Sequence, residues 1–419
     1  MTRDEIQSIA MAELTSHNYT GVVVLDMGTG KSKVAIDCIK QGNFKNVLIT
    51  SPRTNLKSNW INELDKWLIT AYAGNMYLVV EKSSIPIRIL TENIQTCYKW
   101  SEDTIQELDL IIYDEVHTCG PEYFRLIEVA LKYNIPVIGL TGTPNKTEEF
   151  KEAVLYKRLP IIYEYHDSAE DGLINKRRYY IYQYELSDSY NVIAGTKKKP
   201  FTIGEKSQYE YLSQQIKKGQ ILMAQTGSTD WFKDAADWAW KGNGDGSQKS
   251  AAMIYLNAIK YRKEFLWNLS SSADIAIKIK EKILNSQIAN KVLLFSELTT
   301  QANKLSAYAV HSKQQDVTNK MLLEDFDKGI IRELSSVRSL SLGLNLVGAN
   351  WAIVESYNSS PTDLLQKLGR TNRLEVNDVA NVVIIVPKDT QAEAWYNEFA
   401  KSLDLSEAVF INNVTDLKI

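Results

Sequence analysis

The chain has 419 residues, a length that is too great for one compact core and suits two or three domains. Its 48 Lys and Arg against 51 Asp and Glu give a net charge of −3, and 44% of the residues are hydrophobic. These ordinary globular values exclude a disordered, collagen-like or coiled-coil chain. The three widely separated cysteines make neither a disulfide framework nor a zinc site of the CxxC kind. No apolar run resembles a signal peptide or a membrane span, so we expect a cytoplasmic protein.

The charge is unevenly distributed along the chain. Residues 1–150 hold 14 basic and 19 acidic side chains, whereas residues 176–263 hold 15 basic and 8 acidic ones. The basic stretch fits a surface for nucleic-acid phosphates, and it equally fits a solvated face that keeps the fold soluble. The near-neutral total therefore does not exclude a nucleic-acid partner.

Short β-rich segments alternate with longer helical segments in two parts of the chain. Strands are predicted at residues 21–25, 46–50, 108–113 and 135–140, and again at residues 291–295, 351–355 and 381–386. This alternation predicts two α/β domains, each a parallel sheet with helices on both faces. We place the first domain at residues 1–165 and the second at residues 166–419.

The segment between the two alternating parts has a different pattern. Residues 178–186 have the composition of a strand. Residues 187–250 are polar, lysine-rich and aromatic, and they end in a glycine-rich run that predicts a flexible loop. Residues 251–285 carry apolar side chains at helical spacing. We therefore predict a basic, aromatic insertion at about residues 187–250, in or before the second domain.

A phosphate-binding loop is predicted directly after the first strand. Glycines in such a loop let backbone N–H groups face phosphate oxygens, the following helix N-terminus adds partial positive charge, and a lysine reaches the β and γ phosphates. The candidate nucleotide contacts are Met27, Gly28, Thr29, Gly30, Lys31 and Ser32. Lys31 is also a catalytic candidate, and the Ser32 hydroxyl would hold Mg²⁺. The match is partial, because Leu25 stands where the strict pattern has a glycine.

An acidic pair follows the predicted strand at residues 108–113. Asp114 and Glu115 come at its carboxyl end, where open α/β sheets keep their chemistry. Asp114 would hold Mg²⁺, and Glu115 would orient and deprotonate the water that attacks the γ-phosphate. A strand that merely ends in solvated acids would need no phosphate loop upstream. Together the two features predict a nucleoside triphosphatase that uses ATP and Mg²⁺.

With these motifs in this order, the chain resembles superfamily 2 helicases and translocases of the DExH class. The resemblance covers most of the chain except residues 186–250, and its further motifs lie at residues 50–54, 94–96, 140–144, 293–296, 336–350 and 363–373. Within the superfamily the chain is most similar to Swi/Snf-like remodelling ATPases and compact phage helicases of the UvsW type, as in Trp60 before Glu63. DEAD-box RNA helicases resemble it less. The resemblance implies two tandem RecA-like domains.

The resemblance also implies roles for residues outside the two local motifs. One glutamine and two arginines of the last motif would take part in catalysis: Gln366, Arg370 and Arg373. Gln7 would read the adenine, and Gly343 and Asn345 would also contact the nucleotide.

The same resemblance implies residues that couple hydrolysis to domain closure and residues that contact a nucleic-acid strand. His117, Thr141 and Thr143 would couple hydrolysis to closure of the two domains. A nucleic-acid strand would be held, mainly through its phosphates, by residues of several motifs: Arg53, Thr54, Gln95, Thr96, Ser336 and Arg338.

Aromatic side chains gather beside lysines in the insertion. Trp231, Phe232, Trp238 and Trp240 either stack on unpaired bases, at about 1 to 3 kcal/mol per base, or form a small satellite core. We assign Trp238 to such a core and include Trp231 among the candidate nucleic-acid contacts. The exposed part of the insertion is expected to set substrate choice.

The preferred interpretation is an ATP-dependent helicase or translocase that acts on DNA rather than RNA, works as a monomer, and closes its two RecA-like domains on ATP. A catalytically silent nucleic-acid clamp and an RNA helicase remain alternatives. A duplex translocase or branch-migration enzyme that does not separate strands also fits the sequence. A P-loop kinase or GTPase fits less well, because neither needs the second α/β domain with its Gln-x-x-Gly-Arg-x-x-Arg segment.

Overall fold

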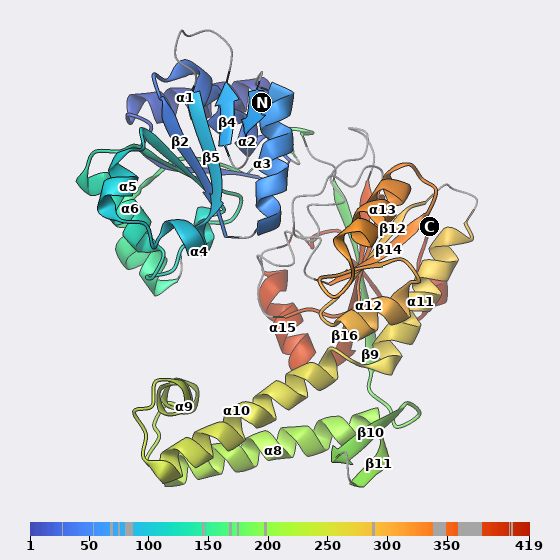
Figure 1. Ribbon diagram of the computed structural model, residues 1–419. Coiled ribbons are helices and arrows are strands. Elements are labelled where there is room, and N and C mark those ends of the chain that lie inside the picture. The colour runs from blue at the N-terminus through green and yellow to red at the C-terminus, as the bar shows by residue number, and fades with distance from the viewer. Residues whose placement is uncertain are drawn as a thin grey trace. The chain divides into compact units, whose positions relative to one another are not determined.

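The computed structural model describes the chain except residues 27, 53, 68–69, 74–75, 80–86, 145, 147, 167–169, 174–175, 197–198, 287–289, 338–348, 359–378, 402 and 404. The described residues divide into two compact units (Figure 1). The first contains residues 1–176 and Val379, and the second contains residues 177–337, 349–358 and 380–419. The boundary thus follows Lys176, whereas the sequence placed it after Tyr165.

The first unit is built on a mixed sheet with the strand order β3-β4-β5-β2-β6-β7-β1-β8. Its strands are β1 (Gly21–Leu25), β2 (Asn46–Ser51), β3 (Thr70–Ala73), β4 (Met76–Val79), β5 (Ile87–Asn93), β6 (Leu110–Asp114), β7 (Val137–Thr141) and β8 (Ile161–Tyr165). Among the described pairs, only those that involve β4 are antiparallel. The strands predicted in the first domain are confirmed as β1, β2, β6 and β7.

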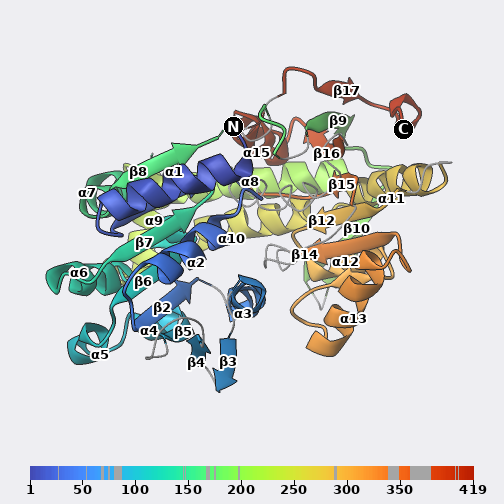
Figure 2. The same cartoon turned by 90° about the horizontal axis from the view of Figure 1, so that it is seen from above.

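Helices cover both faces of this sheet. One face carries α1 (Arg3–Ser16), α2 (Lys31–Gln41) and α3 (Thr54–Trp67), and the other carries α4 (Ile94–Cys97), α5 (Glu102–Gln106) and α6 (Phe124–Lys132). Val23 and Leu25 of β1 belong to the first core, and Val22 and Val24 belong to the second. Strand side chains alternate between faces, so a continuous run of apolar residues fills both cores. Figure 2 shows α1 and α2 side by side on their face.

Shorter helical segments complete the first unit. They are the 3₁₀ turn η1 (Val116–Thr118), the π-helical η2 (Lys151–Leu155) and α7 (Tyr156–Arg158). The 3₁₀ turn follows β6 directly, so it holds the residues after the acidic pair at the carboxyl edge of the sheet.

The second unit contains a parallel sheet with the order β13-β14-β12-β15-β16-β9-β17. Its strands are β9 (Arg177–Glu185), β12 (Val292–Ser296), β13 (Ala309–Val310), β14 (Glu333–Val337), β15 (Trp351–Val354), β16 (Ala380–Lys388) and β17 (Val409–Ile411). Its helices are α11 (Ser270–Leu284), α12 (Thr299–Leu305), α13 (Asp316–Asp327), α15 (Gln391–Ala400) and η5 (Val414–Asp416). Apolar residues of α11 pack on strands β9, β12, β15 and β16 in one core. The predicted strands of the second domain are confirmed as β9, β12, β15 and β16.

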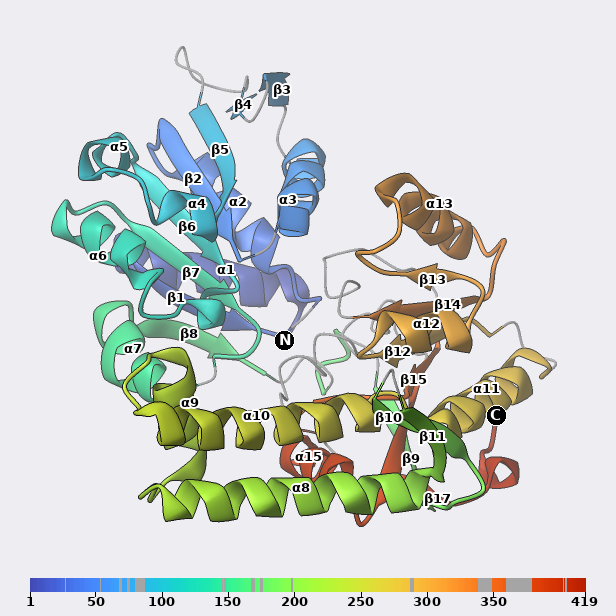
Figure 3. The same ribbon diagram turned by 60° about the horizontal axis from the view of Figure 1, so that its bottom comes forward.

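The insertion forms a hairpin and a helical arm. The hairpin pairs β10 (Asn191–Thr196) with β11 (Lys199–Gly204), and the arm consists of α8 (Glu205–Gln225), α9 (Trp231–Trp240) and α10 (Gly246–Leu266). Figure 3 shows α8 and α10 side by side, with α9 at the end where α8 stops and α10 starts. The arm therefore continues past residue 250, where the sequence ended the insertion.

Two predictions about this segment are tested by the structure. The glycine-rich run was expected to be a loop, and its residues 242–245 do connect α9 to α10, which begins at Gly246 because Asp245 and Gln248 form a capping box that satisfies free helix N–H groups. Trp238 packs against the core of the arm, so its assignment to a satellite core is confirmed. No helix in the described part of the chain is long and apolar enough to cross a bilayer.

Candidate functional site

The loop between β1 and α2 has the backbone of a phosphate-binding loop. Gly28 and Gly30 have φ values of 89° and 100°, in the left-handed region that favours glycine. A Cβ atom on Gly30 would lie 2.3 Å from Nε2 of Gln7, so this position also needs the space. Helix α2 starts at Lys31, and the free N–H groups of a first helical turn are donors of the kind that bind anions.

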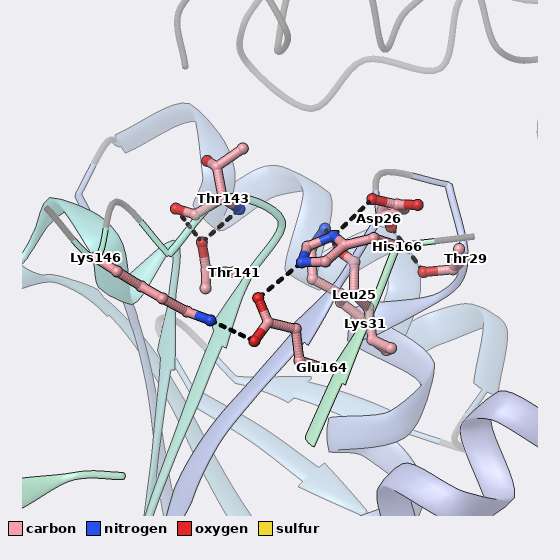
Figure 4. Close-up of polar contacts among 9 residues, drawn as sticks. All are labelled: Leu25, Asp26, Thr29, Lys31, Thr141, Thr143, Lys146, Glu164 and His166. Atoms are coloured by element: carbon pink, nitrogen blue, oxygen red, sulfur yellow. Dashed lines mark hydrogen bonds and ion pairs between the residues drawn. The ribbon is translucent and has the colours of Figure 1, made fainter. Parts of the chain in front are cut away.

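Hydrogen bonds hold the loop in this conformation (Figure 4). Lys31 Nζ donates to the Leu25 carbonyl at 3.0 Å, and the buried Thr29 hydroxyl donates to the Asp26 carbonyl at 2.7 Å. Gln7 Nε2 donates to the Thr29 carbonyl at 2.9 Å. Gln7 was expected to face the adenine, and the structure places its amide against the phosphate loop.

The acidic pair lies at the carboxyl end of β6. Glu115 has φ 52° and ψ 47°, a left-handed conformation that costs a non-glycine residue roughly 1–2 kcal/mol and is found at functional sites. Asp114 accepts hydrogen bonds on both oxygens, from the Glu115 N–H at 3.0 Å and from Trp60 Nε1 at 2.9 Å. Burial and the neighbouring Glu115 raise the pKa of Asp114 to about 6, while Trp60 and Lys31 act in the opposite direction.

The residues expected to couple hydrolysis to closure lie beside this pair. His117 is buried, and its Nδ1 lies 2.8 Å from the Thr141 hydroxyl and 3.2 Å from Oε2 of Glu115. The Thr143 N–H donates to the Thr141 hydroxyl at 3.1 Å. His117, Thr141 and Thr143 are therefore brought together with Glu115, because β7 lies next to β6 in the sheet.

A charged chain at the same sheet edge was not anticipated from the sequence. His166 Nδ1 lies 3.3 Å from Oδ1 of Asp26, and its Nε2 lies 2.8 Å from Oε1 of Glu164 (Figure 4). Lys146 forms an ion pair with Glu164. These residues follow or end β1, β7 and β8, which are neighbours in the sheet. Hydrogen bonds to Asp26 and Glu164 raise the pKa of His166 to about 9.

The structure describes only some of the residues that were expected to contact a nucleic-acid strand. Gln95 and Thr96 are exposed on α4, and Gln95 Nε2 donates to the Pro52 carbonyl at 2.9 Å. Thr54 is the first residue of α3. Trp231 on α9 is 40% exposed. Ser336 is fully buried in β14, which does not favour the contact expected for its hydroxyl.

Several candidates from the sequence lie outside the described residues. They are Met27, Arg53, Arg338, Gly343, Asn345, Gln366, Arg370 and Arg373.

The described residues fit ATP with Mg²⁺. Positive-φ glycines and a helix N-terminus suit the phosphates, and the Gln7 amide lies where a Cβ on Gly30 would stand. Asp114 supplies a carboxylate at a strand end, near enough to Lys31 for that cation to lower its pKa. A carboxylate and a serine hydroxyl are oxygen ligands of the kind that Mg²⁺ prefers.

Two family models match parts of this chain. Residues 2–146 match the family model described as Type III restriction enzyme, res subunit, and residues 275–375 match the helicase conserved C-terminal domain. A search of curated protein sequences finds no significant match.

Solved structures share the fold of the whole chain. S. cerevisiae Dbp5 bound to RNA and ADP BeF3 is similar with a TM-score of 0.57 and 12% identity, over 97% of this chain and 89% of that chain. The Pyrococcus furiosus Hef helicase domain is similar with a TM-score of 0.54 and 17% identity, over 95% of this chain and 97% of that chain. The expected pair of RecA-like domains is thereby confirmed.

The fold and the site define a class of protein, the P-loop proteins with two tandem RecA-like domains. Within that class, the matches to these two family models and the likeness to the Hef helicase domain support a nucleic-acid helicase of superfamily 2.

Proposed function

We propose that the protein is a nucleic-acid-dependent ATPase that works as a DNA helicase or translocase. The observation that carries the proposal is the placement of the phosphate loop and the acidic pair on β1 and β6 of one RecA-like unit, followed by a second such unit in the same chain. Preference for DNA rests on the likeness of the motifs to Swi/Snf-like ATPases and UvsW-type phage helicases. An RNA helicase is the alternative.

The roles of the side chains in this proposal follow from their chemistry. Lys31 and the first turn of α2 bind the phosphates, and Ser32 and Asp114 hold Mg²⁺, which neutralises phosphate charge. Glu115 accepts a proton from the attacking water, and His117 beside it links that water to Thr141. Gly343 and Asn345 contact the nucleotide.

We assign the stabilisation of negative charge in the transition state to the last motif, at residues 363–373. Arg370 and Arg373 act as arginine fingers, and Gln366 helps to position the water, so hydrolysis requires both domains. Loss of the γ-phosphate removes the anion that holds the arginines, and the domains open. Alternation between the two states moves the protein along a strand.

The nucleic-acid strand is held by residues of the first unit and by residues of the motif near residue 338. Exposure of Gln95 and Thr96, and the bond from Gln95 to the carbonyl of Pro52 beside Arg53, support a contact surface on the first unit. Arg53 and Thr54 belong to this proposed surface, and Arg338 is a proposed contact of the second unit. Ser336 is left out of it because it is buried.

The experiment that tests the proposal is ATP hydrolysis measured with single-stranded, duplex, forked and four-way DNA and with RNA, at two salt concentrations. Phosphate contacts release counterions, so stimulation at a limiting concentration of nucleic acid should weaken as salt rises. Lys31→Ala should abolish the stimulated turnover. A wild-type protein that binds DNA but shows no stimulated turnover would be the clamp, and stimulation by RNA alone would identify the RNA helicase.

A further inference from the structure

Trp60 lies on α3 and links the proposed ATP site to the start of this helix, where the proposed contacts to the nucleic-acid strand lie. It is 3% exposed, and it donates its indole N–H to Oδ2 of Asp114 at 2.9 Å. Helix α3 begins at Thr54, directly after Arg53. Thr54 and Trp60 are separated by roughly 9 Å along the helix axis, at about 1.5 Å per residue. One helix therefore joins the proposed strand contacts to a carboxylate of the ATP site.

Packing determines where the indole N–H points. Trp60 and Leu64 are buried in the same core as residues of the phosphate-loop helix α2, and α3 also packs against β2 and β5. Indole has one donor and no acceptor, so only one orientation of the ring makes the bond to Asp114. A shift or rotation of α3 must therefore change the position of this donor relative to the carboxylate.

The carboxylate of Asp114 is held from two sides. Its Oδ1 accepts the N–H of Glu115, and its Oδ2 accepts the indole of Trp60. These two donors determine the plane of the carboxylate and leave its other lone pairs for the proposed Mg²⁺. Outer partners of metal-binding carboxylates typically change metal affinity by about 10- to 100-fold when removed.

A second tryptophan on the same helix shows what is specific to Trp60. Trp67 Nε1 also donates to a carboxylate, Oε2 of Glu63, at 2.9 Å. That bond stays within α3, between residues four apart, and does not reach the sheet. Trp67 therefore donates to a carboxylate as Trp60 does, but not to Asp114; its ring faces Lys33 of α2, and replacement by another aromatic residue keeps a ring in that place.

We propose that Trp60 is a positioning residue that couples strand binding at the start of α3 to the orientation of Asp114. The inference rests on the proposed function and adds a route between its two ligands. Coupling between two binding sites is reciprocal. The factor by which Mg²⁺ with ATP changes the affinity for the nucleic-acid strand therefore equals the factor by which that strand changes the affinity for Mg²⁺ with ATP.

The test compares Trp60→Phe with Trp67→Phe, each of which keeps an aromatic ring and removes one N–H. Binding of a fluorescent ATP analogue is titrated with Mg²⁺ and in EDTA, with and without single-stranded DNA. In Trp60→Phe, the Mg²⁺ concentration for half-saturation should rise about 10-fold or more, binding in EDTA should be unchanged, and the effect of DNA on binding should approach a factor of one. Trp67→Phe should match wild type.

Two outcomes overturn the inference. One is a Trp60→Phe protein that keeps the wild-type Mg²⁺ dependence and the full DNA effect. The other is an equal loss in Trp67→Phe, which would indicate general loosening of α3. Thermal unfolding checks each fold, and Trp60→Leu, which also lacks the donor, replaces Trp60→Phe if that variant does not fold.

Failure of the proposed function would give a different result. Wild-type nucleotide binding that Lys31→Ala does not weaken would contradict the ATPase proposal itself, whereas wild-type binding that DNA never alters would contradict the coupling. A DNA effect that is present in wild type and persists in Trp60→Phe would contradict only the role of Trp60.

Discussion

At the scale of single residues, His166 shows how a half-exposed side chain acquires an unusual charge state. Both of its ring nitrogens face carboxylate oxygens, of Asp26 and Glu164, so both must carry a proton in order to donate. The positive ring lies between the residue that opens the phosphate loop and an edge strand. It balances the charge of Asp26 beside a loop that has to bind an anion.

We expect His166 to make the stability of the protein depend on pH. Its pKa is raised to about 9, above the value of about 6.5 for an unperturbed histidine, so its stabilising contribution is complete below about pH 6.5 and is lost as pH rises through about 9. Exposure and screening keep this contribution below about 1 kcal/mol.

The measurement is the free energy of unfolding of wild type and His166→Gln in denaturant at pH 6, 7.5 and 9.5. The variant should be less stable at pH 6 and equal to wild type at pH 9.5. A difference that does not change with pH would mean that the charge of His166 has no part in its contacts.

At the scale of elements, α8 and α10 pack closely enough that one position between them requires glycine. A Cβ atom on Gly219 would lie 2.8 Å from the Cα atom of Tyr255. Because the obstacle is backbone, the two helices would have to separate. The usual gain from replacing glycine by alanine in a helix, about 1 kcal/mol, is therefore outweighed here.

Gly219→Ala should destabilise the arm by about 1 to 3 kcal/mol, the range for an overpacked core. Hydrogen exchange followed by mass spectrometry should show faster exchange in α8 and α10, while the first unit is unaffected. Gly246→Ala is the matched control, because it also adds a methyl group to the arm and nothing lies within 4 Å of its Cβ position. Equal protection in both variants would show that the helices adjust freely.

The exposed aromatic side chains of α9 carry a separate prediction. Trp231, Phe232 and Trp240 are 40%, 57% and 70% exposed. Replacing all three by alanine should weaken binding to forked DNA at least 10-fold, since each stacked base contributes about 1 to 3 kcal/mol. The slope of log affinity against log salt should stay the same, because no phosphate contact is lost.

The control for this variant is a pair of exposed apolar residues on the same arm. Met253 and Ile254 of α10 are 48% and 47% exposed, and neither has an aromatic ring. Their replacement by alanine should leave fork affinity unchanged. If the α9 variant binds forked and plain duplex DNA as wild type does, the arm does not set substrate choice by stacking.

At the scale of the whole molecule, the proposed cycle separates ATP binding from hydrolysis. Glu115→Gln removes the proposed general base and keeps the side-chain length, so ATP should still bind and the two domains should still close. We expect turnover to fall by about 10² to 10⁴ and the protein to stay on DNA longer with ATP. DNA dissociation rates with ATP and with ADP measure the second effect.

Arg370→Ala tests the other half of the cycle. Loss of an arginine finger should lower turnover by about 10³ to 10⁵ with a smaller effect on ATP affinity, and it should not trap DNA. Equal loss of ATP binding in Glu115→Gln and Arg370→Ala would contradict both roles.

Much of this protein could be predicted from local sequence. Runs such as Gly21–Leu25 have apolar residues at every position, which indicates strands covered on both faces, and the glycines after Leu25 permit the left-handed backbone that the structure has. The acidic pair at the end of β6 is likewise a local signal. These features depend on residues that are neighbours in the chain, so local preferences determine them.

The remaining contacts depend on strand order and helix packing, which local preferences do not determine. Only the tertiary structure brings Trp60 to Asp114, His166 to Asp26, and Gln7 to the phosphate loop. The physical reason is that the order β6-β7-β1-β8 and the packing of α1 and α3 place residues far apart in the chain at one sheet edge. The sequence by itself determined the two α/β domains and the local chemistry of the proposed ATP site, and the tertiary structure decided which side chains hold that chemistry in place.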